Sequence, residues 1–332
     1  DPRYPIIPWR SFYSITVSWL VIAFSMWLVL SVSPWFYPLS FVLIANRILA
    51  LSLLCHEGLH RTLHPSGKWN DFLGRYLCAF PTSISFSKYR RLHLLHHSTV
   101  GSDRWDPDQH LYKNFPVKPS KFFLNLLARV LTLRTAYDFI LYYMEFPEAF
   151  RRKRVSDGSL FIFSNRSDFI PFVIFLTVCL SLVTYFQVWP QFLLLYIAPL
   201  MLLTQPYVIL IGGIQHGPQR IAERDVSRTV SGSTLYMWLL LPIDINFHAA
   251  HHLDATVPHY WLKKKSDDLL KEGHTLWTEN YLETMRSLFD PHPLRANREK
   301  VAPQAPIDRS THQEQLPVQI VMHIGKGDEI EA

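Results

Sequence analysis

The chain has 332 residues and a formal net charge of +6, and only 18% of its residues are charged. Typical soluble domains carry about 25% charged residues, and the 10 Trp, 15 Tyr and 22 Phe exclude a disordered chain. No Asp, Glu, Lys or Arg occurs from Ser11 to Asn46 or from Phe169 to Gln219. Because a membrane-spanning helix needs about 20 apolar residues, these two stretches indicate a membrane protein with several spans.

We predict four spanning helices, over residues 12–33, 38–59, 168–188 and 191–214. The short links inside each pair contain no Lys or Arg, whereas the segment from His56 to Arg166 contains 17. Because Lys and Arg concentrate in cytoplasmic loops, we expect both termini and this middle segment in the cytoplasm. The predicted fold is an all-α integral membrane protein, with two transmembrane hairpins and a cytoplasmic helical cap.

Shorter apolar segments lie between and after these spans. Residues 71–85 and 231–247 are apolar enough to lie at the membrane interface, and residues 122–146 have the pattern of an amphipathic surface helix. The run Arg151–Arg154 suits a contact with lipid headgroups or with an acidic partner. Arg47 falls inside the second span, where it could bind a carboxylate or a headgroup, or extend toward the membrane surface.

Domain organisation follows from the same composition. We assign residues 1–295 to one membrane domain and residues 296–332, which are polar and without pattern, to a flexible tail. The three cysteines, Cys55, Cys78 and Cys179, are isolated, which excludes a disulfide framework or a zinc ribbon.

Histidines form three boxes and one single site. There is one HxxxH box, there are two HxxHH boxes, and the single histidine follows the fourth predicted span: His56 and His60; His93, His96 and His97; His248, His251 and His252; His216. On a helix, residues at i, i+3 and i+4 share one face, so each box presents its imidazoles to one point. One HxxHH is expected by chance about 0.04 times in such a chain, which argues against coincidence.

All four groups fall at the cytoplasmic ends of spans or in the cytoplasmic segments, so they can meet just below the membrane. Nine imidazoles are too many for one ion, and imidazole suits zinc, copper, iron and nickel. Two metal ions with four or five ligands each is the natural interpretation. For six other histidines we expect structural roles, and His259 is left open: His64, His110, His274, His292, His312 and His323.

With these boxes in this order the chain resembles the membrane fatty acid desaturase superfamily. Its second box runs on into Gly101 and Asp106-Pro107-Asp108, and its third is followed by Val257-Pro258-His259-Tyr260. The resemblance covers about residues 10–290 and implies that the nine histidines bind two iron ions. An asparagine that helps to hold one iron in the stearoyl-type enzymes is replaced here by Gly212, so Gln215 or Asn246 would have to substitute.

The implied activity is O₂-dependent oxidation of an unactivated C–H bond in a lipid or acyl chain. Desaturation of a fatty acyl chain is the first expectation, and hydroxylation or ketone formation on an acyl chain or carotenoid is the alternative on the same ligands. The sequence contains no haem, dinucleotide or iron–sulfur motif, so we expect electrons from a separate carrier such as a ferredoxin. Carboxylates and amides that could orient the ligating imidazoles are Glu57, Asp106, Asp108, Asp244 and Asn246.

Two other classes of protein compete with this interpretation. His56-Glu57-Gly58-Leu59-His60 is a literal HExxH, the signature of a zinc metalloprotease with Glu57 as base. A protease, however, leaves both HxxHH boxes unexplained. A metal carrier or receptor would place ionisable ligands near the middle of the membrane, but the third and fourth spans hold none between Asp168 and His216.

Overall fold

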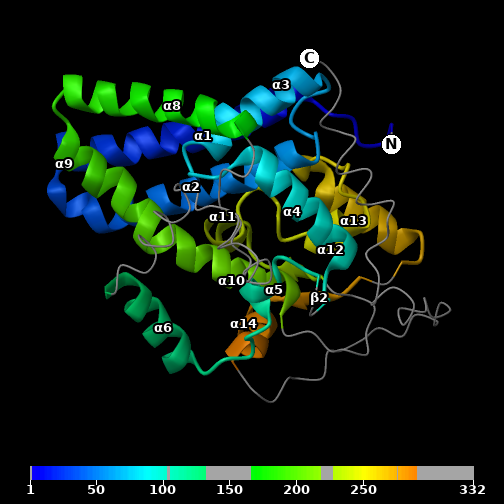
Figure 1. Cartoon of the computed structure of the whole chain (residues 1–332). Helices are drawn as coiled ribbons and strands as arrows, with labels where there is room; N and C mark the ends of the chain where they lie inside the picture. Colours follow the sequence, from blue (N-terminus) through cyan, green and yellow to red (C-terminus); the bar gives the residue numbers. More distant parts are fainter. Residues whose placement is uncertain (1, 103–104, 132–165, 218–226, 275, 290–332) are drawn as a thin grey trace, which may run out of the picture.

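Four long apolar helices organise the computed structural model (Figure 1), which describes residues 2–102, 105–131, 166–217, 227–274 and 276–289. The helices long and apolar enough to cross a membrane are Pro8–Val32, Pro34–Leu59, Asp168–Tyr185 and Trp189–His216. The four predicted spans are therefore confirmed as apolar helices. Proline stands in the first turn of α1 (Pro8–Trp27) and of α2 (Tyr37–Leu59), where its missing N–H costs no helical hydrogen bond.

The helix α2 occupies the centre of the molecule. Its apolar window is 61% buried, against 22%, 11% and 29% for the other three spans, and α1 packs along it. The third span is α8 (Arg166–Tyr185), and the fourth begins with α9 (Trp189–Phe192) and ends with α10 (Gln205–His216). Two π-helical segments, Leu193–Ile197 and Leu200–Thr204, join α9 to α10.

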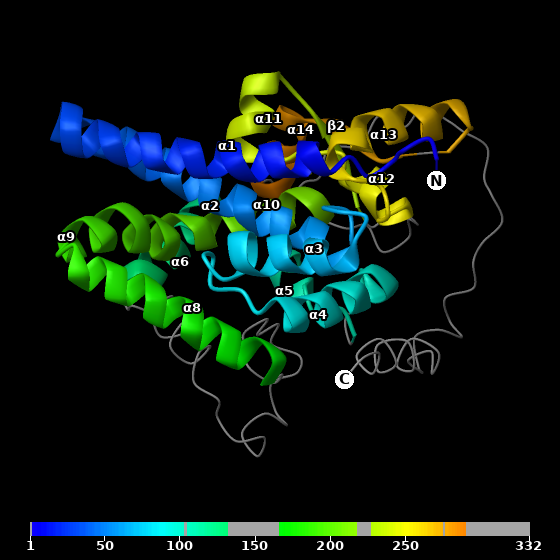
Figure 2. The same ribbon diagram turned by 90° about the horizontal axis from the view of Figure 1, so that it is seen from above.

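Shorter helices gather at one end of these spans, away from α9 (Figures 1 and 2). They are α3 (Gly67–Phe72), α4 (Phe86–Thr99), α5 (Gln109–Tyr112), α11 (Thr234–Leu240), α12 (His248–Leu253), α13 (Leu262–Lys271) and α14 (Tyr281–Phe289). The three-residue strands β1 (Thr229–Ser231) and β2 (Thr278–Asn280) pair in parallel with Thr229 opposite Thr278. These strands are an addition to the predicted all-α fold, and runs this short carry no readable sequence period.

The start of α4 is fixed by a buried carboxylate from α8. Asp168 is fully buried and accepts hydrogen bonds from Ser85 Oγ and from the backbone N–H of Ser87, both at 2.8 Å. Arg75 pairs with the same carboxylate at 3.0 Å. The helix that carries the second histidine box is thereby tied to the third span.

The predicted interfacial segments have mixed outcomes. Residues 71–85 are helical as far as Ala79, through α3 and the π-helical segment Leu73–Ala79, and residues 231–247 contain α11. The predicted amphipathic helix over residues 122–146 is observed as α6 (Pro119–Leu131), with its remainder outside the described residues. Arg151–Arg154 and the predicted tail also lie outside them.

Arg47 is buried inside the protein and caps a neighbouring helix. Its guanidinium lies 4.0 Å from the ring centroid of Trp238 and donates to the Trp238 carbonyl at 3.1 Å. It also donates to Oδ1 of Asn46, whose amide donates to the Leu239 carbonyl. Cations and donors near a helix C-terminus satisfy its free carbonyls. Arg47 therefore satisfies a carbonyl group at the C-terminal end of α11. Among the described residues it has no carboxylate partner.

Candidate metal centre

The nine box and single histidines converge from α2, α4, α10 and α12. Ring nitrogens of a first group lie within 4.8 Å of one another: His56, His60, His93, His97 and His251. A second group with the same spacing contains His96, His216 and His252. Nε2 of His248 lies 3.0 Å from Nε2 of His216 and 3.0 Å from Nε2 of His252, which adds His248 to the second group.

Each HxxHH box contributes to both groups. Helix α4 supplies His93 and His97 to the first group and His96 to the second. Helix α12 supplies His251 to the first group, and His248 and His252 to the second. In each HxxHH box, the two histidines four residues apart belong to the same group, and the third histidine belongs to the other group. The two groups lie side by side across the space between α4 and α12.

The spacing of the nitrogens fits shared metal ions. Nε2 of His97 lies 2.9 Å from Nε2 of His93 and 3.1 Å from Nε2 of His251. Metal–nitrogen bonds of about 2.0–2.1 Å place two ligands at right angles about 3 Å apart. The buried Nε2 of His60 also has no hydrogen-bond partner among the described residues, and a coordinated metal would satisfy it.

Burial keeps most of these imidazoles neutral. Burial and, to a smaller extent, the neighbouring imidazoles together lower the pKa of His97 to about 2. Burial and the same neighbours hold the pKa well below its usual value for the other histidines outside the spans: His60, His93, His248, His251 and His252. Because metal binds the neutral imidazole, the groups are prepared for metal at neutral pH.

His96 differs because a carboxylate holds its other ring nitrogen. Nδ1 of His96 lies 2.7 Å from Oδ1 of Asp106. Burial lowers the pKa of His96, but this hydrogen bond and the charges of Asp108 and Asp106 outweigh it and raise the pKa. Asp106 also accepts from the Tyr112 hydroxyl and from the Gly101 N–H. Such a contact fixes the tautomer and leaves Nε2 of His96 for a metal.

The other predicted orienting residues lie elsewhere. Glu57 accepts hydrogen bonds at 2.8 Å from Thr62 Oγ1 and from the His259 N–H, and its Oε1 is 3.9 Å from Nδ1 of His56. Asp108 Oδ2 is 3.9 Å from Nδ1 of His96. These two carboxylates are near the centre but accept no hydrogen bond from a box histidine among the described residues.

Asp244 and Asn246 contact other residues than the histidines of the two groups. Asp244 lies 3.9 Å from Nδ1 of His259, and its side chain is 54% exposed. The Asn246 amide donates to the Val230 carbonyl at 3.0 Å. Nε2 of Gln215, by contrast, is buried beside His216 without a hydrogen-bond partner among the described residues. Gly212 has no room for a side chain, because a Cβ there would lie 2.6 Å from Cβ of Leu111.

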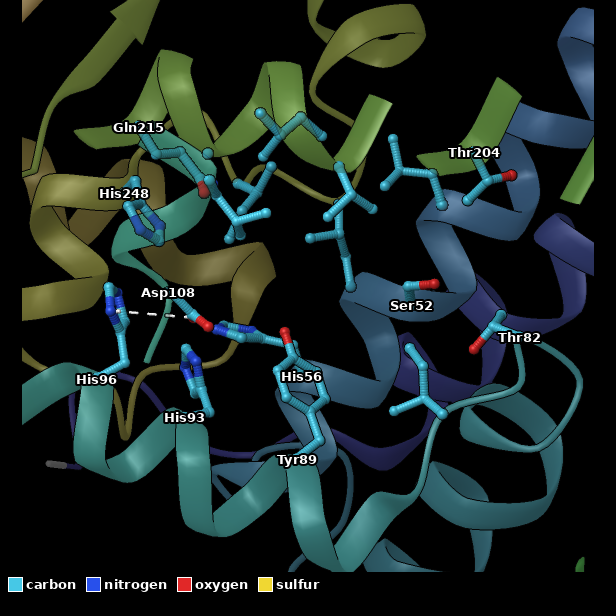
Figure 3. A pocket seen from close by; sticks show the side chains of 18 of the residues that line it. Ser52, His56, Thr82, Tyr89, His93, His96, Asp108, Thr204, Gln215 and His248 are labelled. Carbon is cyan, nitrogen blue, oxygen red and sulfur yellow. Dashed lines mark ion pairs between the residues drawn. The ribbon is translucent and has the colours of Figure 1, made fainter. Parts of the chain in front are cut away.

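A cavity of about 140 Å³ leads away from the histidines (Figure 3). His56, His93, His96 and His248 stand at one end, with Ser52, Thr82 and Thr204 at the other. The walls between are mostly aliphatic: Leu49, Leu53, Leu111, Leu200, Val208, Ile211 and Ile245. Neither this cavity nor the role of Tyr112 was predicted from the sequence, since the lining residues come from five separate segments without a shared motif.

The comparison with known proteins decides the family. A family model described as fatty acid desaturase matches residues 32–280, which include every histidine of the two groups. The chain belongs to the fatty acid desaturase family. The HExxH sequence lies inside this match. Glu57, the base that a protease would need, accepts hydrogen bonds from Thr62 Oγ1 and from the His259 N–H. The protease interpretation therefore has no support.

One curated relative is similar over a short stretch. It is the dihydrorhizobitoxine desaturase of Bradyrhizobium elkanii, 37% identical over 95 residues. The similarity covers 28% of this chain and 27% of the relative. Family membership and this relative support an oxidoreductase activity of the desaturase type, and the chain has apolar helices that suit a membrane and histidine groups that can hold metal.

Proposed function

We propose that this membrane protein is a di-iron, O₂-dependent desaturase of a fatty acyl chain. The observation that carries the proposal is the convergence of nine imidazoles, in groups of five and four, at one end of an aliphatic cavity. Each group would hold one iron ion, and the pair would supply the oxidising chemistry with O₂ as co-substrate.

The cavity supports an acyl chain as the substrate. A saturated chain offers no polar group for recognition, so only aliphatic contact and shape can place it. Leu53, Val208 and Ile211 would hold the chain with its methylenes directed past His56 and His248. Removal of two hydrogens as an alkene forms, with O₂ reduced to two waters, consumes two electrons and two protons from outside.

Residues around the histidines would orient them and keep water out. Asp106 fixes the ring of His96, and Tyr112 fixes Asp106. Burial raises the pKa of Asp108, whose carboxyl lines the cavity beside His96. Nε2 of Gln215 is buried next to His216 without a partner in the part of the chain that the structure describes, so Gln215 suits the role of holding a water on the second group better than Asn246 does.

Orientation in the membrane follows from charge. We propose that the two helical hairpins enter from the cytoplasmic side, with both termini and the histidine groups on that side, since the basic segments flank these groups. Residues 1–295 would form one membrane domain. Electrons would come from a separate small carrier, such as a ferredoxin.

Metal and product analysis test the proposal together. Elemental mass spectrometry of the detergent-purified protein should find about two irons per chain, one for each histidine group. Lipids of an expressing host should gain an unsaturated fatty acid that His96→Ala abolishes. One zinc per chain would overturn the assignment of iron. A new hydroxylated lipid in place of the alkene would overturn the assignment of the reaction as desaturation.

A further inference from the structure

The two histidine groups have a buried side and a solvent side. Six of the nine histidines are at most 3% exposed, and those on the cavity wall are among them. The other three, His60, His97 and His252, are half-buried. The cavity lies on the buried side, so an acyl substrate and an electron carrier need not compete for one approach.

The half-buried histidines connect both groups at the surface. The rings of His97 and His252 stack with centroids 4.3 Å apart and an angle of 22° between their planes. His97 belongs to the first group and His252 to the second. The ring of His60 lies 4.8 Å from that of His97. One patch of surface therefore touches ligands of both groups.

Apolar and basic side chains border these rings. Leu94 is 40% exposed and Leu253 is 56% exposed, and each directly follows a histidine of the centre. Arg61 is exposed next to His60, and Arg90 and Arg91 lie on α4 one turn before Leu94. Arg90 also donates to the Leu59 carbonyl and pairs with Asp71, which places it beside the end of α2.

We propose that this patch is the docking site of an acidic one-electron carrier protein, which rests on the proposed di-iron function. We call it the electron-entry face: the half-buried His60, His97 and His252, the exposed Leu94 and Leu253, and the arginines Arg61, Arg90 and Arg91. Small apolar contacts inside a charged rim are typical of brief protein encounters. Each encounter would oxidise the carrier by one electron and reduce the centre by one, so two encounters supply one turnover.

Its position in the molecule supports an aqueous partner. Helices α4 and α12 both lie at the end opposite α9 in the two views (Figures 1 and 2). A basic rim attracts an acidic protein over a distance of about 10 Å at ordinary salt and speeds its association. Among the described residues, two acidic side chains near the face are engaged: Asp71 pairs with Arg90, and Asp254 pairs with Lys265 at 2.8 Å.

Binding of an oxidised, acidic [2Fe–2S] ferredoxin to the purified chain in nanodiscs of zwitterionic lipid tests the proposal. Arg61→Glu should weaken the Kd about tenfold and Leu253→Ser about threefold, and added salt should weaken wild-type binding. The matched controls Lys121→Glu and Leu124→Ser, on the distant and exposed surface of α6 (Figure 1), should leave the Kd unchanged. Arg61→Asn replaces Arg61→Glu if the latter misfolds, since Asn tolerates the positive φ of 60° at this position.

Reduction kinetics add a second readout. Ferredoxin should reduce the iron-loaded wild type faster than Arg61→Glu, while dithionite, which is too small to need a docking site, should reduce both at one rate. Three outcomes would each overturn the docking site. The face variants could have the same Kd as wild type, the α6 controls could weaken binding as much as the face variants do, or the wild type could fail to bind ferredoxin. Binding needs no turnover, so a failure of the desaturase proposal would appear separately, as absent iron or absent product.

Discussion

Oδ1 of Asp106 accepts a hydrogen bond from Nδ1 of His96 at 2.7 Å, and both side chains are buried. Asp106 lies ten residues after His96, on the segment that leads to α5. Burial raises the pKa of Asp106, but its hydrogen bonds with His96 and Tyr112 and the charge of His96 lower it below the usual value. The carboxylate is therefore charged and orients the ring of His96.

Asp106→Asn should weaken metal retention by about 10–100-fold, the usual cost of removing such an orienting contact. Elemental mass spectrometry after dialysis against a chelator measures it. Asp108→Asn is the matched control, because its Oδ2 lies 3.9 Å from the same nitrogen and should matter less. Equal metal loss in both variants would show that the hydrogen bond is not the cause.

Removal of one histidine should act on one group. His251→Ala leaves four histidines in the first group, and His252→Ala leaves three in the second, so the metal content should fall more in His252→Ala. The control His64→Ala removes a half-buried ring that accepts from the Ser66 N–H and belongs to neither group. Metal content and alkene product are measured together, and loss of metal in His64→Ala would contradict the ligand assignment.

A large side chain at the far end of the cavity should shorten the accepted substrate. Ser52→Phe fills the end opposite the histidines (Figure 3) and should lower kcat/KM for the longest substrate about tenfold, or about 1.4 kcal/mol. Shorter chains should be spared. The same change at Val42, which is 39% exposed on α2, is the control. A uniform fall for all chain lengths would argue against a substrate cavity here.

Loss of the Arg47 guanidinium should destabilise the fold. Arg47→Met leaves the Trp238 carbonyl and Oδ1 of Asn46 without this donor, which costs about 1–3 kcal/mol for a buried group. Thermal unfolding in detergent measures it as a lower Tm. Arg47→Lys keeps the charge but not the planar stack on Trp238. Its Tm should therefore lie between those of wild type and Arg47→Met. A Tm equal to that of wild type in Arg47→Met would refute the capping role.

The metal-free protein should lose stability as the pH falls below about 6.5. An unfolded chain protonates its histidines near their usual pKa of 6.5, whereas the folded chain protonates His97 only near about 2. The unfolded state therefore binds more protons in this range, and each such histidine costs about 1.4 kcal/mol per pH unit. Tm measured from neutral to mildly acidic pH should fall, and less steeply in His97→Gln. A flat profile would show that these rings are solvated.

The spans and the boxes were predictable because each depends on local sequence. A stretch such as Phe169 to Gln219, without one charge, is readable whatever it packs against. The histidines of one box share a helix face for the same local reason. The family resemblance, carried by those boxes, is confirmed by the match over residues 32–280.

Contacts between distant segments were not predictable. No pattern joins Tyr112 to Asp106, because α5 is a four-residue helix without a period. Arg47 finds its partner Trp238 from a segment 191 residues away. Orientation of the predicted carboxylates also depended on packing: Asp106 meets a box histidine, whereas Glu57 meets Thr62 and the His259 backbone.

Because α4 and α12 each divide their histidines between the two groups, the two groups share one scaffold. An ion in the first group would hold His97 and His251 at their present spacing, and the same two helices would then hold His96, His248 and His252 at theirs in the second. The first ion thus prepares the site of the next, which is positive cooperativity by a shared scaffold. Titration with iron should pass almost directly from empty to doubly loaded chains, with the singly loaded species always scarce.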